Sequence, residues 1–243
     1  ICRNIVAASF LKKTAITNRF KQIKYAFATI KQSSEDDFMN YILIVLIGYL
    51  FGCSNMATYL AAYKKIDLQT EGSGNPGASN AMLLMGWKAG ILVGIHDIGK
   101  AVLAVILVNL LFPSVALAGA IAGVSCVLGH MFPFYLGFHG GKGFASYLGM
   151  TLALHWKFAL VLLIAVVIIT LVTDYIVIGT MTTVVSFPLY SAWIDNWLMA
   201  LIISIASTVI IYKHRNNLIH IYRGTEIGFR SANRGEHRVS KRS

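Results

Sequence analysis

Two short glycine-rich loops carry the residues best suited to chemistry. The first runs from Gly72 to Asn80, and the second is Gly140-Gly141-Lys142-Gly143. Loops with few side chains let backbone N–H groups approach an anion, and a nearby lysine adds positive charge. Each loop follows a long apolar stretch. The pair therefore predicts a phosphate handled at a membrane surface, although glycines in membrane proteins also serve turns and close helix packing.

Further polar residues lie within apolar segments, where an ionisable group is costly and becomes a functional candidate. Asp97 and Lys100 are three residues apart, so they share a helix face and can form an ion pair. This pair either neutralises itself, positions a phosphate-binding lysine, or lets Lys100 touch phosphate directly. His130 ends another apolar run, where a lone histidine is more often an interfacial residue than a base. His139 adds a titratable donor beside the second loop.

A third polar group follows the last apolar segment. Lys213 and Arg215 are explained as the positive anchor on the cytoplasmic side of a membrane helix. That anchor does not explain His214, Asn217 or Glu226. Their hydrogen-bonding side chains suit a polyol or a polar headgroup.

The composition is that of a membrane protein. Hydrophobic residues make up 56% of the 243 residues and charged residues only 13%, whereas soluble domains carry about 25% charged residues. The net charge of +11 comes from the ends, because residues 1–38 and 213–243 hold 15 of the 21 Lys and Arg. Anionic lipid headgroups account for a basic tail. We expect no nucleic-acid partner, because the core has no basic face, and no metal site, because the three cysteines lack metal spacing.

Apolar segments of about 20 residues predict membrane helices. We expect an all-α integral membrane protein with about seven transmembrane helices. The basic tail places the C-terminus in the cytoplasm, and counting back places the N-terminus of the core outside and both glycine loops on the cytoplasmic face. The predicted helices are Tyr41–Tyr63, Trp87–Leu111, Val115–Leu128, a short Gly143–Trp156, two helices divided at Thr173-Asp174 within Phe158–Ala192, and Asn196–Tyr212.

The chain divides into three parts by composition. Residues 39–229 are expected to form the membrane domain, and residues 230–243 a solvated basic tail. Residues 1–38 contain no long apolar run. We expect them to lie outside the core, either as upstream sequence translated by mistake or as an amphipathic surface helix.

Taken together, these motifs resemble those of the bacterial PlsY family of acyl-phosphate:glycerol-3-phosphate acyltransferases. The resemblance covers about Met39 to Phe229. It is carried by Gly72–Asn80, Asp97-Ile98-Gly99-Lys100, Gly129-His130 with Phe132-Pro133, Phe138–Gly143, and His214-Arg215 with Asn217 and Gly224-Thr225-Glu226.

The resemblance implies a multi-pass enzyme of the bacterial cytoplasmic membrane that serves phospholipid biosynthesis. Such an enzyme moves a fatty acyl group from acyl phosphate to the sn-1 hydroxyl of glycerol 3-phosphate, and lysophosphatidic acid and phosphate are the products. The resemblance implies no metal and no cofactor. The implied partners are acyl phosphate, glycerol 3-phosphate, the lipid bilayer and the enzyme that makes acyl phosphate.

The resemblance also assigns residues. Ser73 and Lys142 would hold phosphate, and His214 and Asn217 would lie near the acceptor glycerol; these four form the predicted catalytic group. A general base is not assigned, because an oxygen of the donor phosphate can accept the hydroxyl proton. The predicted substrate-binding residues are Gly72, Asn75, Ser79, Asn80, Asp97, Lys100, His130, His139, Gly140, Gly141, Gly143 and Glu226.

Three positions depart from the family pattern. Leu83 stands where the family has an arginine that binds the acceptor phosphate, His139 replaces a lysine, and His220 replaces another basic residue. A lost charged hydrogen bond costs about 1.5–3 kcal/mol, so the acceptor remains open. Two other hypotheses also remain: a membrane carrier of phosphorylated metabolites, and a catalytically silent paralogue.

Overall fold

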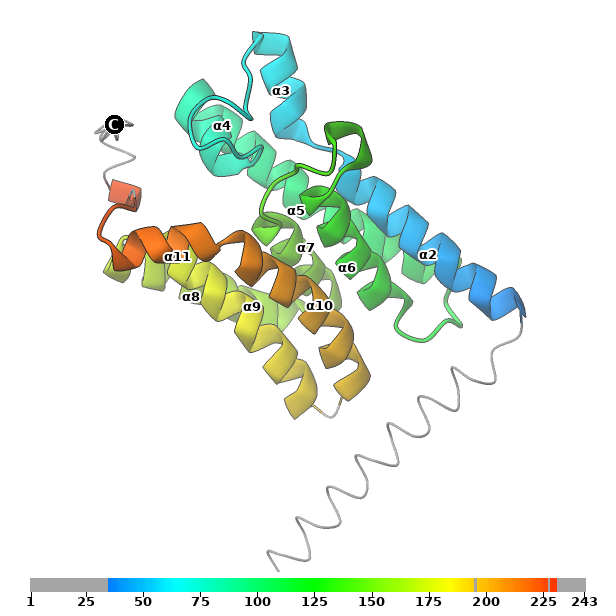
Figure 1. Cartoon of the computed structure of the whole chain (residues 1–243). Coiled ribbons are helices and arrows are strands. Elements are labelled where there is room, and N and C mark those ends of the chain that lie inside the picture. Colours follow the sequence, from blue (N-terminus) through cyan, green and yellow to red (C-terminus); the bar gives the residue numbers. More distant parts are fainter. Residues whose placement is uncertain (1–34, 195, 227, 231–243) are drawn as a thin grey trace, which may run out of the picture.

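The computed structural model describes residues 35–194, 196–226 and 228–230 (Figure 1). The expectations for residues 1–34 and 231–243 therefore lie outside the described residues. Within the described ranges, every regular element is a helix. The all-α membrane fold predicted from the sequence is confirmed.

The helices follow one another with short connections, except where the two glycine loops occur. They are α2 (Glu35–Cys53), α3 (Met56–Lys64), α4 (Ala78–Met85), α5 (Trp87–Leu111), α6 (Ala118–Met131), the 3-10 turn η1 (Phe134–Leu136), α7 (Phe144–Leu154), α8 (Trp156–Thr173), α9 (Ile176–Trp193), α10 (Trp197–Lys213) and α11 (Arg215–Tyr222).

The number of crossings is close to the prediction. Five helical segments in the described part of the chain are long and apolar enough to span a membrane, and α10 with α11, bent by 48°, makes a sixth. The seventh predicted helix is α7. Its 11 residues span only about 16 Å, against a hydrocarbon core of about 30 Å. Which face is cytoplasmic stays a prediction.

The first predicted span, Tyr41–Tyr63, is interrupted. α2 ends at Cys53 and α3 begins at Met56. The Asn55 side chain causes the new start, because its Oδ1 accepts a hydrogen bond from Thr58 N at 3.1 Å and so caps α3. Its Nδ2 also donates to Pro76 O at 3.2 Å. Asn55 therefore ties the helix break to the first glycine loop.

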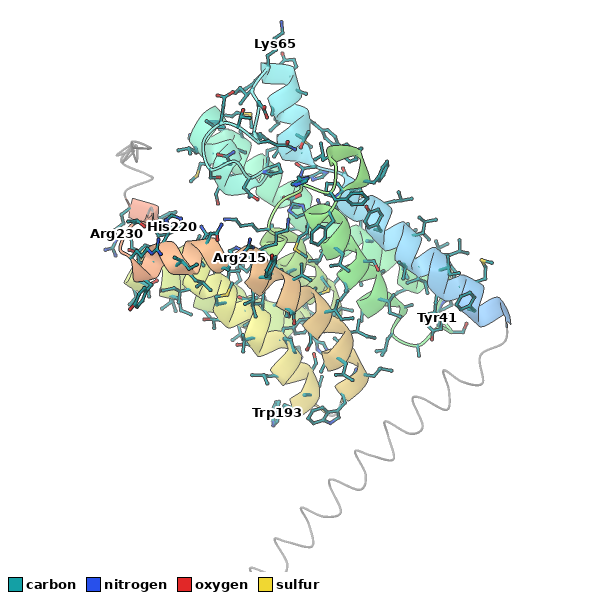
Figure 2. The ribbon with its side chains drawn as sticks, viewed as in Figure 1. Tyr41, Lys65, Trp193, Arg215, His220 and Arg230 are labelled. Carbon is teal, nitrogen blue, oxygen red and sulfur yellow. The ribbon has the colours of Figure 1, made fainter. Side chains whose placement is uncertain are left out.

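The two ends of the bundle differ in chemistry. Figure 2 shows Lys65, Arg215, His220 and Arg230 toward one end, and Tyr41 and Trp193 toward the other. A concentration of basic residues at one face is typical of a membrane protein. The two glycine loops lie at the basic end, next to α3, α4 and α11 (Figure 1).

Close helix packing holds this bundle together. α2 lies along α6, and α7 packs against α5, α6 and α8. A Cβ at Gly48 or Gly52 of α2 would overlap the α6 backbone, and one at Gly129 of α6 would overlap the α2 backbone. These glycines let the two helices approach closely, which is how membrane helices gain packing energy in lipid.

We predict that Gly52→Ala destabilises the bundle. The added methyl group would overlap Cys126 O, so the helices must separate, and overpacking of this kind costs about 1–3 kcal/mol. Gly94→Ala is the matched control, because no atom lies within 4 Å of its added Cβ. Thermal unfolding in detergent micelles should give a lower midpoint for Gly52→Ala alone. Equal midpoints would contradict the proposed close approach.

Candidate active site

The first glycine loop is built around the buried side chain of Asn80. Its Oδ1 accepts from Ser73 N at 2.8 Å, and its Nδ2 donates to Leu68 O and Glu71 O, each at 3.2 Å. Gly72 has a φ of 62°, and a Cβ there would overlap Asn80 Oδ1. Glycine is needed at this position for both reasons. Asn80 shapes the loop from inside, and its contact with a substrate stays a prediction.

The exposed side of this loop carries Ser73 and Ser79, and Asn75 is half-buried. Ser79 lies in the first turn of α4. The N-cap of α4 is Gly77, which supplies no side-chain cap. The first N–H groups of an uncapped helix favour an anion. This end of α4 is thus suited to a phosphate group.

The second glycine loop folds back on the end of α6. Gly140 N donates to Met131 O at 3.1 Å, and Gly141 N donates to His130 O at 3.2 Å. A Cβ at Gly141 would overlap the His130 ring. Gly143 has a φ of 88° and caps α7 without a side-chain hydrogen bond. The loop therefore presents a second uncapped helix N-terminus.

Lys142 connects this loop to the start of α11. Its Nζ donates to Asn217 Oδ1 at 2.5 Å, and Asn217 Nδ2 donates to Glu226 Oε1 at 2.6 Å. Burial lowers the pKa of the Lys142 ammonium, and the Glu226 carboxylate offsets part of that shift. Three residues predicted separately from the sequence form one hydrogen-bonded chain. A Lys ammonium has three N–H donors, so two remain for a ligand once Asn217 is bound.

Three histidines near these loops differ in their placement. His214 is buried, and its Nδ1 lies 2.9 Å from Ile210 O. Because a carbonyl only accepts, Nδ1 carries the proton and Nε2 remains an acceptor. His139 is exposed and binds Gly137 O, and His220 is exposed and binds Thr225 Oγ1. Both exposed histidines are held by local contacts.

A buried polar cluster lies behind the second loop. Lys100 Nζ lies 2.8 Å from Asp97 Oδ1 and 2.9 Å from His130 Nδ1. Only 2–5% of each of these three residues is exposed. The third contact of the ammonium is Ser54 O, at 2.7 Å. All three N–H donors of Lys100 are therefore directed at protein atoms.

This cluster joins the helix break to the glycine loop. Ser54 Oγ lies 3.0 Å from His96 Nε2, and His96 Nδ1 lies 3.5 Å from Asp97 Oδ1. On the other side, His130 accepts from Lys100 through Nδ1, so its proton is on Nε2, beside Gly141. A change at Lys100 would thus reach both loops.

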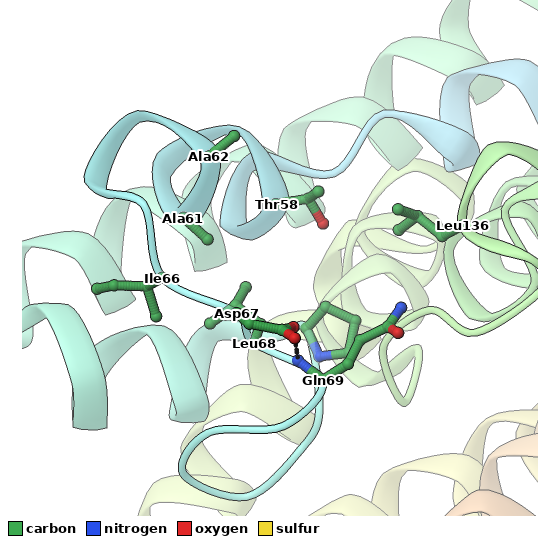
Figure 3. Close-up of a pocket in the computed structure, with 9 residues that line it drawn as sticks. Thr58, Ala61, Ala62, Ile66, Asp67, Leu68, Gln69 and Leu136 are labelled. Atoms are coloured by element: carbon green, nitrogen blue, oxygen red, sulfur yellow. Dashed lines mark hydrogen bonds between the residues drawn. The ribbon is translucent and has the colours of Figure 1, made fainter.

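A small hollow lies between α3 and the first glycine loop (Figure 3). Its volume is about 190 Å³, below the range of about 300–1,000 Å³ usual for ligand pockets. Leu136 of η1 faces Gln69 across it, and Pro76 also lines the hollow. The hollow shows that the first loop and the segment after α6 are neighbours. We assign it no ligand.

Sequence reasoning missed Ser54 and Asn55. Asn55 is a polar residue in an apolar segment, which was a readable signal. The role of Ser54 was not readable, because Lys100 binds its backbone carbonyl and not its side chain.

Comparison with known proteins gives a consistent result. The sequence model of the family described as glycerol-3-phosphate acyltransferase matches residues 42–224. The glycerol-3-phosphate acyltransferase of Thermoanaerobacter pseudethanolicus is 36% identical over 190 residues, which cover 77% of this chain and 95% of that protein. Glycerol-3-phosphate acyltransferase 1 of Oceanobacillus iheyensis is 33% identical, over 74% of this chain and 90% of that protein.

Two solved structures also match. Both are crystal structures of PlsY, an integral membrane glycerol 3-phosphate acyltransferase. Its glycerol 3-phosphate form has a TM-score of 0.72 at 30% identity and covers 79% of this chain and 97% of that chain. Its lysophosphatidic acid form has a TM-score of 0.69 at 29% identity, with 79% and 98% covered.

We predict that Lys100→Met unfolds the protein more readily than removal of the whole ion pair. Loss of Lys100 leaves the buried Asp97 carboxylate without its ammonium partner, with His130 and His96 as its remaining neighbours at 3.4 and 3.5 Å, and breaking a buried pair costs about 3–5 kcal/mol. The double variant Asp97→Leu with Lys100→Met leaves no unpaired charge in the pair and should recover part of that loss. Chemical denaturation in micelles measures both. A double variant no more stable than Lys100→Met would contradict the pairing.

Proposed function

Because this chain belongs to the glycerol-3-phosphate acyltransferase family, we propose that it moves a fatty acyl group from acyl phosphate to glycerol 3-phosphate. The protein is a multi-pass membrane enzyme and an acyltransferase. Its acceptor is glycerol 3-phosphate and its product lysophosphatidic acid, the two ligands named for the PlsY structures. Acyl phosphate as the donor is the part that we add.

The proposed reaction needs no covalent enzyme intermediate. The sn-1 hydroxyl oxygen attacks the carbonyl carbon of acyl phosphate, and the bond from that carbon to the phosphate oxygen breaks. The hydroxyl proton passes to the departing phosphate. Acyl phosphate is a reactive mixed anhydride, so orientation of the two substrates supplies much of the rate.

The observation that carries this proposal is the chain Lys142–Asn217–Glu226. It joins the second glycine loop to the segment after α10 and holds a half-buried ammonium group at the loop. Two phosphates must come close together, and their repulsion opposes this. A cation in a site partly shielded from water offsets that repulsion more strongly than one in bulk water.

The other predicted residues support this centre in different ways. Ser73 is exposed on the first loop and Ser79 at the uncapped start of α4, and both hydroxyl groups suit the second phosphate. The free Nε2 of His214 suits the acceptor hydroxyl. Asp97, Lys100 and His130 are buried and paired with one another, which supports a positioning role behind the Gly141 loop over direct phosphate contact.

The catalytic unit that we propose is residues 39–229. The family match over residues 42–224 supports these limits. Helix α2 begins at Glu35, four residues before the proposed boundary.

The decisive assay uses purified protein with palmitoyl phosphate and glycerol 3-phosphate. Lysophosphatidic acid and inorganic phosphate should form in equal amounts. Lipid product with palmitoyl coenzyme A but none with palmitoyl phosphate would overturn the proposed donor. Glycerol 3-phosphate uptake into sealed vesicles without lipid product would support the carrier hypothesis, and no activity in either assay would support a silent paralogue.

We predict that Lys142→Ala lowers kcat at least about 100-fold, as loss of one group that stabilises transition-state charge does. The protein should stay folded, because Lys142 lies in a loop between glycines. Lys157→Ala is the matched control, since Lys157 lies against Trp156 at the start of α8, away from both loops. Near-normal turnover by a folded Lys142→Ala variant would remove Lys142 from the site.

We predict that Leu83→Arg lowers the KM for glycerol 3-phosphate by about 10-fold or more, the equivalent of one charged hydrogen bond. Leu83 lies beside Gly72 of the first loop, where a guanidinium group can bind phosphate through two donors. kcat should change little, because ground state and transition state share the phosphate contact. Met82→Arg on the same helix is the control. An unchanged KM would show a pocket rebuilt around leucine.

A further inference from the structure

Asp174 lies in the turn between α8 and α9, where the end of α8 requires an uncommon backbone conformation. Its φ is 71°, the left-handed conformation, and its N–H closes the end of α8 by donating to Thr170 O. Glycine and asparagine also tolerate this conformation. The turn by itself therefore does not require a carboxylate.

The carboxylate is used by the chain segment 228–230, which returns from α11. Arg230 N donates to Asp174 Oδ1 at 2.8 Å, and Phe229 N donates to Asp174 O at 2.8 Å. The Arg230 side chain donates to Leu171 O at the end of α8. A Cβ at Gly228 would overlap the Asp174 carboxylate. Three hydrogen bonds, one of them to the carboxylate, thus fasten this segment to the turn, and Gly228 packs against the carboxylate.

The fastened segment begins two residues after Glu226, the end of the Lys142–Asn217–Glu226 chain. On its other side, Glu226 follows the end of α11, where its N–H and that of Thr225 both donate to His220 O. Without the Asp174 carboxylate, Arg230 N loses its acceptor and Gly228 loses its packing partner, so the segment after Glu226 keeps two of its three hydrogen bonds to the α8–α9 turn. Asn217 Nδ2 would then lose its carboxylate partner more often, and Lys142 would be less well oriented.

We propose that Asp174 is a positioning residue for acyl transfer: it fastens residues 228–230 to the α8–α9 turn and so holds Glu226 on Asn217 and, through Asn217, orients Lys142. This inference rests on the proposed function, because it assumes that Lys142 acts on phosphate. Asp174 acts only through the chain segment that it binds.

The test compares Asp174→Gly with Asp174→Asn. Glycine and asparagine both adopt the left-handed conformation of this turn. Only asparagine keeps a side-chain oxygen that can accept a hydrogen bond from Arg230 N. Asp174→Gly should lower kcat about 10-fold, the scale of a small misplacement of a reacting group. Asp174→Asn should stay within about threefold of the wild type, since it keeps the hydrogen bond. Lipid product from palmitoyl phosphate and glycerol 3-phosphate is the measurement.

A double-mutant cycle with Glu226→Ala separates positioning from simple structural loss. If Asp174 acts through Glu226, adding Asp174→Gly to Glu226→Ala should lower kcat by less than about twofold more. Full multiplication of the two effects would overturn the proposal, as would normal kcat in Asp174→Gly. Thermal midpoints of both turn variants should match the wild type; a lowered midpoint with multiplied effects would mark Asp174 as structural only. An inactive wild type would instead reject the proposed function.

Discussion

A lysine ammonium buried among membrane helices needs an acceptor for each of its three N–H groups, because lipid and packed side chains supply none. Lys100 obtains them from three separate segments: the Asp97 carboxylate one helical turn away, the His130 ring on α6, and the Ser54 carbonyl where α2 ends. The helix break at Ser54 is therefore part of the same arrangement, since an unbroken helix would use that carbonyl for its own hydrogen bonds.

Residues of this cluster and of the adjacent helix break contact both glycine loops and so fix their positions. His130 packs against Gly141, so the second loop can follow the end of α6 only with glycine at that position. On the other side of the break, Asn55 caps α3 and binds Pro76 of the first loop. The two loops are thus attached to opposite sides of one buried ion pair, and a rigid bundle positions loops that carry almost no side chains of their own.

The arrangement suits a reaction between two anions. In the reaction that we propose, acyl phosphate and glycerol 3-phosphate repel each other, and the donor is reactive enough that holding the pair together would supply much of the catalysis. In the proposed reaction, backbone N–H groups at the starts of α4 and α7 and the half-buried Lys142 would offset this repulsion without adding bulk. Lys142 is in turn held by Asn217 and Glu226, and their support comes from the last described segment of the chain, fastened at Asp174.

The sequence alone determined that this chain is an all-helical membrane protein, because long apolar runs leave the backbone no other way to satisfy its hydrogen bonds in lipid. It also marked the motif residues as candidates, since ionisable groups within or beside apolar spans are costly and the order of the motifs resembles that of one family. Only the tertiary structure decided which of those residues meet. The N–H donors of Lys100 are all directed at protein acceptors, whereas Lys142 binds Asn217. The contacts of Ser54 and Asp174 could not be predicted from any local sequence pattern. These contacts join residues 30 to 75 positions apart, and Ser54 takes part through its backbone carbonyl. Every residue has such a carbonyl, so only the packing of distant helices determines which one a buried cation will use.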